Sequence, residues 1–479
     1  MRRLLTFLLA ALLPLTSAPP AKVVRGSEWK AHFVSDLLPF WNREEAWGTP
    51  RGAFPTFRCN DGRLPDAVAP CPELAQPPGW IRPELNREYT RMRSRQTYFY
   101  GVAFHLTGDP ELLALARDGV TWIRSQALDP ATGSAISYWE SGVAGPPVLH
   151  RTSQDLAYAQ LGLAMYYYLT RDEAVLQDIL RLKEHIFTRY WDPRWGMLRW
   201  VVEDGGSGEA DRQELVAQLD QINAYLLLLA PILPEPHRSA WTEDLVRLSR
   251  VMIERYHDPE RHLFWGTLHD PQSRTLGSRH TDFGHTAKAL WMIERVGRLA
   301  RKPDLVGFAR REAKHLLQQA YLPDTSSWAS RLRPDGTLDV HKDWWIYVEL
   351  DQLAATLALS EAALTRYLPG PQRYWLKHFV DPVGGEVWGW VNGRTGEPGA
   401  GLKIHHWKNG YHSAEHALIG YLTAESLAGK AATLHFALPE PKSAVRPYVF
   451  TGVEKARRRS PLPGFPGRQR VAVDLVQLR

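Results

Sequence analysis

Cysteine is scarce in this sequence, since only Cys59 and Cys71 occur among 479 residues. At most one disulfide can therefore form within the chain. In an exported protein the two thiols would meet an oxidising environment, so we expect a Cys59–Cys71 bridge. It would close an early loop that contains Asn60-Asp61-Gly62. Two unlinked loop thiols are the alternative.

The N-terminus lacks an apolar run long enough to span a bilayer comfortably, because the run Leu4–Leu15 is too short. The run follows the basic start Arg2-Arg3 and precedes the small residues Thr16-Ser17-Ala18, a pattern typical of a secretory signal peptide over residues 1–21. No cysteine follows it directly, so we expect no bacterial lipid anchor. The mature protein is predicted to be secreted or periplasmic, without membrane association.

Charge of one sign does not dominate the chain. The formal net charge is +6, and part of it comes from the basic start and from the run Lys455–Arg459. The remainder mixes both signs, which argues against a nucleic-acid-binding surface. We interpret residues 455–459 as a solvated basic loop.

The apolar content is ample for a large core: 44% of the residues are hydrophobic and 11% aromatic. The length allows one to three domains. Most of the 19 Trp, 18 Tyr and 15 Phe are expected in the core. Aromatic side chains that line a central funnel of the fold would instead suit sugar rings, whose faces present polarised C–H groups to aromatic side chains.

A turn phrase recurs at intervals of about sixty residues, which is the mark of a repeated supersecondary unit. Its copies are Asp129–Gly133, Asp192–Gly196, Asp258–His262, a worn Pro323–Trp328 and Asp381–Gly385, with Asn60–Gly62 as an earlier sixth. The clear copies at 129, 192 and 381 combine Asp-Pro with a later Gly, as a tight turn requires, and the copy at 258 has His262 in place of the Gly.

The segments between these phrases have helical patterns. Ala414, Ala417, Leu418, Tyr421 and Leu422, for example, follow the spacing of one helix face. Six helix pairs can close into a ring around a funnel. We therefore predict an all-α fold, an (α/α)6 barrel of six helix pairs over residues 28–432.

After residue 432 the pattern changes to short β-like stretches between Pro and Gly turns. We expect strands at residues 433–438, 446–450 and 470–475. They would form a small C-terminal β appendage over residues 433–479, packed on the barrel.

Two histidines occupy similar frames far apart in the chain. Asp282-Phe-Gly-His285 precedes Lys288 by one turn, and Tyr411-His412 precedes Glu415 in the same way. Each histidine opens an amphipathic helix. Because imidazole titrates near neutral pH, two such rings facing one carbon could remove a proton and return one.

Several stretches together resemble the N-acylglucosamine 2-epimerase superfamily, from about Gly52 to Leu422. The stretches that carry the resemblance are Gly52–Gly62, Arg95–Tyr100, Lys342–Glu349, Gly284-His285 and Trp407–His412. The resemblance implies a cofactor-independent and metal-independent reaction on a reducing sugar, either a small molecule or an oligosaccharide. The ring opens, a histidine takes the C2 proton, and a cis-enediolate forms. The proton then returns to the other face of C2 or goes to C1.

The resemblance also implies roles for single residues. His285 and His412 would be the acid/base pair. Arg95 would hold the sugar oxygens and the enediolate charge, since a guanidinium can grip two adjacent oxygens. Trp345 would stack on the sugar and Glu349 would orient its neighbours. Glu349, Lys408 and Tyr411 are all expected to contribute to substrate binding.

The sequence departs from the family at two positions. Lys288 stands where the family commonly has Glu, and Glu415 where it commonly has Arg. We expect both to support the histidines, and we interpret them as one pair whose signs have been exchanged. Where the family often has a histidine-rich stretch, this chain has Asp220 and Asn223, which we expect near the funnel without a catalytic role.

The sequence is also compatible with other functions. Glycoside hydrolases and polysaccharide lyases also use (α/α)6 barrels, with Asp155, Asp220, Glu349 and Asp351 as carboxylates that a hydrolase could use. A non-catalytic glycan-binding barrel is a further alternative.

The string from His412 to His416 also fits a zinc-protease motif, although no third ligand is evident. We expect His405 and His406 to be exposed and Trp344 to lie in the core.

Overall fold

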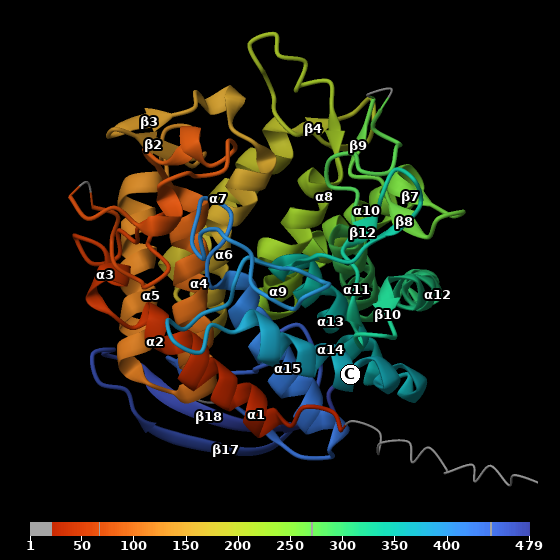
Figure 1. The fold of residues 1–479 in the computed structure, drawn as a ribbon. Coiled ribbons are helices and arrows are strands. Elements are labelled where there is room, and N and C mark those ends of the chain that lie inside the picture. The colour runs from red at the N-terminus through yellow and green to blue at the C-terminus, as the bar shows by residue number, and fades with distance from the viewer. Residues whose placement is uncertain (1–21, 67, 270–271, 441–442) are drawn as a thin grey trace, which may run out of the picture.

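The computed structural model describes residues 22–66, 68–269, 272–440 and 443–479 (Figure 1). The predicted signal peptide, residues 1–21, lies outside the described residues. The fold is mostly helical, with a small antiparallel sheet at the C-terminal end.

The helices pack in two layers. The inner ones are α4 (Thr90–Thr107), α6 (Ser153–Thr170), α8 (Leu215–Gln221) with its continuation to α9 (Leu227–Leu229), α11 (Phe283–Leu299), α13 (Trp344–Ala358) and α15 (Tyr411–Leu427). Each of them contacts the next, and α15 contacts α4 again, so the contacts form a closed circle. The segment Leu215–Ile232 is apolar enough to cross a membrane, but 89% of it is buried inside the protein, as in a core helix.

The outer helices cover this circle (Figure 1). Helix α5 (Pro110–Trp122) packs on α4, α7 (Glu173–Arg189) on α6, α10 (His237–Tyr256) on α8, α12 (Pro303–Ala320) on α11, and the short α1 (Gly26–Ala31) on α15. Helix α14 (Pro369–Tyr374) and the turn after it bring aromatic rings onto Tyr347 of α13. Two short helices, α2 (Leu38–Trp41) and α3 (Glu44–Trp47), complete the N-terminal part.

The recurring phrase forms turns, as predicted, and three of its copies close short hairpins. Strands β4 (Trp191–Asp192) and β5 (Met197–Leu198) pair around Gly196, whose φ of 64° suits glycine. Strands β7 (His257–Asp258) and β8 (Leu263–Phe264), and β10 (Tyr321–Leu322) and β11 (Ser327–Trp328), pair in the same way. In the worn copy, Leu322 pairs with Ser327 as Asp192 does with Met197, so the true equivalent of the Asp lies two residues before Asp324.

Further short strands bring chain segments to the N-terminal ends of the inner helices. They are β1 (Arg87–Tyr89), β2 (Tyr138–Glu140), β3 (Val143–Gly145), β6 (Gln213–Glu214), β9 (Thr267–Leu268), β12 (Arg331–Leu332), β13 (Leu338–Asp339), β14 (Lys342–Asp343) and β15 (Trp390–Val391). Strands β1, β6 and β14 lead directly into α4, α8 and α13, which fixes where these helices begin.

The C-terminal sheet has the order β16 (Ala432–Leu438), β18 (Gln469–Val476), β17 (Val453–Pro461), all antiparallel. The predicted strands at 433–438 and 470–475 are confirmed. The prediction of a strand at 446–450 is wrong, because Tyr448 has a φ of 57° and turns into the core.

The basic run at residues 455–459 is part of β17 and not a loop. Its side chains suit an exposed edge strand, and Arg458 pairs with Asp474 of the neighbouring strand at 2.6 Å.

The predicted disulfide is present, with the Cα atoms of Cys59 and Cys71 5.3 Å apart. Its loop packs against the segment before α15. Asn60 Nδ2 donates to the carbonyl of Gly401, and the backbone N–H of Lys403 donates to Asn60 Oδ1. The bridge therefore braces the chain that leads into His412.

Candidate active site

A cavity of ≈ 240 Å³ lies at the N-terminal ends of the inner helices. Its wall is made by Arg95, Gln154, Tyr158, Asp220, His280, His285, Lys288, Trp344, Trp345, Trp407 and His412. Every inner helix of the circle contributes at least one of these side chains. The N-terminal ends of helices carry partial positive charge, so this end of the fold favours a ligand that develops negative charge.

His285 is held by the residue that caps its helix. Asp282 Oδ1 accepts the backbone N–H of His285, and Asp282 Oδ2 lies 2.8 Å from His285 Nδ1. Burial opposes ionisation of Asp282, but the His285 contacts outweigh it and the pKa of Asp282 is lowered. The carboxylate thus accepts Nδ1–H and leaves Nε2 of His285 free to exchange a proton in the cavity.

His412 stands at the start of α15 with a different partner. Its Nδ1 lies 3.6 Å from Oε1 of Glu349, which is fully buried on α13. Burial, with the charges of Arg95, Lys288 and Lys408, holds the pKa of His412 well below its usual range. The ring is therefore neutral at rest and can accept a proton.

Trp345 contacts both imidazoles. Its ring centroid lies 4.6 Å from that of His285 and 6.3 Å from that of His412. A Cβ at Gly284 would lie 2.7 Å from the Trp345 ring, so glycine is required for this close approach. The sequence prediction placed Trp345 in the funnel, and it lines the cavity as predicted; Trp344, predicted in the core, is mostly buried but also lines it.

Arg95 brings a guanidinium to the same cavity. Its Nη1 donates to the carbonyl of Trp407 at 2.5 Å, and its Cζ lies 4.1 Å from the centroid of the Tyr158 ring. These contacts fix the side chain while part of it remains facing the cavity.

The exchanged pair of Lys288 and Glu415 is not formed. Lys288 Nζ instead donates to Asp220 Oδ1 at 2.7 Å and to the hydroxyl of Tyr158 at 3.1 Å. Burial opposes both charges, but each stabilises the other, so the pKa of Lys288 is raised and that of Asp220 is lowered. Asp220 lies on the neighbouring inner helix α8, and it takes the place of Glu415 as the ion-pair partner of Lys288.

Several predicted substrate contacts lie behind the wall and not in it. Glu349 accepts from Trp291 Nε1 at 2.8 Å, and the Tyr411 hydroxyl hydrogen-bonds Asn223. Lys408 is fully buried, 3.7 Å from Glu386 Oε1. None of these side chains lines the cavity, so they cannot contact a sugar there without rearrangement.

His405 and His406 are buried, contrary to the prediction, with 6% and 5% of their surfaces exposed. The ring of Trp80 covers both, with its centroid 5.0 Å from that of His405 and 5.5 Å from that of His406. Burial lowers the pKa of His406 to about 3, so this ring is neutral.

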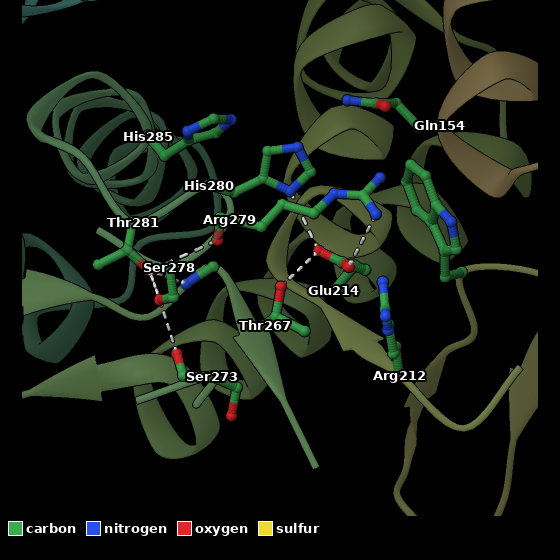
Figure 2. Close-up of polar contacts among 12 residues, drawn as sticks. Gln154, Arg212, Glu214, Thr267, Ser273, Ser278, Arg279, His280, Thr281 and His285 are labelled. Carbon is green, nitrogen blue, oxygen red and sulfur yellow. Dashed lines mark hydrogen bonds and ion pairs between the residues drawn. The ribbon is translucent and has the colours of Figure 1, made fainter. Parts of the chain in front are cut away.

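Sequence reasoning missed His280, whose ring centroid lies 4.9 Å from that of His285. Figure 2 shows His280 between His285 and Glu214, which accepts from His280 Nδ1 at 3.0 Å and from Thr267 Oγ1. Gln154 and Tyr158 were also missed; both meet Asp220. The position of His280, five residues before His285 on the segment that enters α11, was the available signal.

Near the cavity, the described residues bring together one group of metal-ligating type. A carboxylate oxygen of Glu349, one of Glu415 and a nitrogen of His412 lie within 4.8 Å of one another, all buried. His416 of the zinc-protease string points elsewhere, because its Nε2 lies 3.0 Å from Asp351 and its ring packs on Trp29. The string therefore does not converge on one point.

Comparison with known proteins gives one family. The model described as N-acylglucosamine 2-epimerase matches residues 81–414. No match is found among curated proteins.

Among solved structures, the cellobiose 2-epimerase from Spirochaeta thermophila DSM 6192 is similar at 20% identity and a TM-score of 0.67, covering 84% of this chain and 97% of its own. A D-mannose isomerase is similar at 14% identity and a TM-score of 0.65, covering 83% of this chain and 98% of its own. The GH76A alpha-1,6-mannanase from Salegentibacter sp. HEL1_6 is less similar, at 12% identity and a TM-score of 0.54. The match covers 84% of this chain and 99% of its own. At these identities the likeness shows a shared fold.

Proposed function

The chain belongs to the N-acylglucosamine 2-epimerase family, and we propose that it epimerises or isomerises a reducing sugar at C2. One observation carries the proposal. His285 and His412 come from two inner helices, line the same cavity and flank Trp345. Arg95 lines that cavity as well.

In the proposed reaction, the open-chain sugar binds with C2 between the two imidazoles. One imidazole Nε2 takes the C2 proton, and the C2–H electron pair forms a C1–C2 double bond. The π electrons of the C1=O bond move onto O1, which gives a cis-enediolate. The other imidazole returns a proton to the opposite face of C2, or a proton is returned to C1. Because the reaction is reversible, each ring serves as base in one direction and acid in the other.

The negative charge of the enediolate needs fixed positive charge nearby. Arg95 and Lys288 both line the cavity, and the N-terminal ends of the inner helices point toward it. Asp282 can balance the charge of a His285 imidazolium, since it already accepts the Nδ1–H of that ring. We assign Trp345 the role of packing against the sugar.

A glycoside hydrolase is less well supported. Hydrolysis commonly needs two carboxyl groups that flank the scissile bond. Of the described residues that line the cavity, Asp220 is the one carboxylate, and Lys288 already neutralises it. Glu349 and Asp351 lie behind the wall, the latter hydrogen-bonded to Trp328 and His416.

We further propose the architecture and location predicted from the sequence. The closed circle of helix contacts supports an (α/α)6 barrel over residues 28–432, with the sheet of residues 433–479 as an appendage. The Cys59–Cys71 disulfide supports export to an oxidising compartment. Mass spectrometry of the N-terminus after cell fractionation tests the proposed export. A cytoplasmic protein that retains residues 1–21 would refute it.

The direct test of function is incubation with a panel of reducing mono- and disaccharides in D₂O, followed by NMR without added metal. We expect loss of the C2 proton signal and the appearance of an epimer or a ketose. New reducing ends would indicate a hydrolase. Binding without exchange would indicate a glycan-binding barrel.

A further inference from the structure

Three neighbouring residues behind the cavity wall each have a buried polar atom that finds no hydrogen-bond partner among the described residues. The atoms are Oε1 of Glu349, Nδ1 of His412 and Oε2 of Glu415. The three residues are at least nine-tenths buried. A buried polar atom without a partner costs free energy, so three together indicate that a proton or ion lies between them.

The remaining oxygens of the two carboxylates are already occupied. Glu349 Oε2 accepts from Trp291 Nε1, and Glu415 Oε1 accepts from the hydroxyl of Tyr448 at 2.6 Å. Tyr448 is itself fixed by the hydroxyl of Tyr98 at 2.9 Å. The other oxygen of each carboxylate, Glu349 Oε1 and Glu415 Oε2, makes no hydrogen bond of normal geometry with the described residues.

The nearby cations have other partners. Lys288 pairs with Asp220, and Lys408 lies beside Glu386. Arg95 donates to the Trp407 carbonyl. Burial holds the pKa of the neighbouring Tyr98 and Tyr411 well above its usual range, so both hydroxyls are neutral, as is the Gln352 amide. A carboxylate oxygen of Glu349 and one of Glu415 lie within 4.8 Å of each other. In a buried site, two carboxylates at this separation cannot both ionise without a cation between them.

We propose that Glu349 and Glu415 hold one proton between them at neutral pH, and that this pair sets the tautomer of His412. Glu415 donates its proton to Glu349, and Glu349 accepts the Nδ1–H of His412. Nε2 of His412 then carries a lone pair toward the sugar. Glu415 is thus a positioning residue that acts through Glu349, and Tyr448 orients it from beyond the region that the family model matches.

The electrostatics support this arrangement. Burial and the neighbouring Glu415 raise the pKa of Glu349 to about 8, although Lys288 opposes the shift. Burial also raises the pKa of Glu415, against the Tyr448 hydrogen bond and Lys288. The pair titrates as a unit, so the proton belongs to both carboxylates.

The protonation is testable without any sugar, so its failure is separate from failure of the proposed function. Infrared difference spectra at pH 7 are expected to contain a protonated-carboxyl band that disappears in Glu415→Gln. The amide of this variant donates permanently and carries no titrating proton. Glu425→Gln, at the other end of α15, is the matched control and should keep the band.

Stability gives a second readout. The folded pair retains a proton between the unfolded pKa and about 8, so the Tm of the native chain should fall as pH rises through that window. The fall should be smaller in Glu415→Gln and unchanged in Glu425→Gln. If Glu415→Gln does not fold, Glu349→Gln serves the same comparison.

Three results would overturn the proposal: no carboxyl band in the native protein, equal Tm slopes in Glu415→Gln and the native chain, or a stoichiometric metal ion in the purified protein. If turnover is found, the positioning role adds a further expectation. Glu415→Gln should lose the alkaline inflection of the kcat profile, and Glu415→Ala, which lacks the donor, should lower kcat more than Glu415→Gln does. Equal effects of the two substitutions would contradict the positioning role.

Discussion

At the residue scale, the two imidazoles differ in what lies behind them. An ionised Asp282 supports His285, whereas a carboxylate pair lies behind His412. The family motifs predicted that both histidines, Arg95 and Trp345 lie at one site, and all four side chains line the cavity. Their roles remain predictions. The same motifs misplaced Glu349 and Tyr411, since neighbouring residues on a helix point about 100° apart and the sequence does not say which faces the funnel.

Asp282 has two separable tasks, capping α11 and holding His285. Asparagine caps helices about as well as aspartate but cannot balance an imidazolium. We therefore expect Asp282→Asn to lower kcat by about 100-fold or more, in the range typical of general acid–base catalysis. Its Tm should remain close to that of the native chain. A variant that keeps full activity would contradict the role of the carboxylate.

The Lys288–Asp220 pair makes a second prediction at this scale. Lys288→Met leaves Asp220 buried without its cation, which should cost about 3–5 kcal/mol of unfolding free energy. The loss should shrink as pH falls, because protonation of Asp220 then removes the unpaired charge. Urea unfolding measures both effects.

The double variant Lys288→Met/Asp220→Asn is the control for the pair. It should recover much of the lost stability because no unpaired charge remains. If Glu415→Gln restored the Lys288→Met protein and Asp220→Asn did not, the exchanged-pair interpretation would have to be revived.

At the scale of elements, the repeat was predictable because its turn chemistry is local. Asp-Pro followed by a residue with positive φ, Gly196 or His262, produces the hairpins at 191–198 and 257–264. The worn copy at 321–328 keeps Pro323 and a positive φ at Ser326. The strand expected at 446–450 failed because burial of Tyr448 against Tyr98 and Glu415 outweighs local β propensity. That contact joins segments about 350 residues apart in sequence, which a local pattern cannot reveal.

Removal of the Cys59–Cys71 disulfide should affect both the stability of the fold and substrate binding. Replacing both cysteines by serine should lower the unfolding free energy by about 2–4 kcal/mol. Because Asn60 braces Gly401 and Lys403, KM should rise more than kcat falls. Unfolding curves of the double variant measure the first effect and steady-state kinetics the second. An unchanged midpoint would contradict the bracing role.

At the scale of the whole molecule, the fold gathers side chains from distant parts of the chain into one cavity. Six repeated helix pairs predict a ring of helices. In such a ring, the N-terminal ends of the inner helices are expected to converge on one site. The sequence could not predict how the appendage docks, because β16 contacts α4 and α6 through packing that has no repeat. The appendage thereby places Tyr448 against Glu415, three residues after His412 on α15.

The central claim is that His285 and His412 exchange protons on opposite sides of one carbon. The most direct measurement is deuterium exchange at C2, followed by NMR from each epimer separately, in His285→Asn and His412→Asn. Each variant should lose epimerisation but still exchange the epimer that faces its remaining imidazole, and the two variants should prefer opposite epimers. Exchange of both epimers by both variants, at the native rate, would contradict the claim.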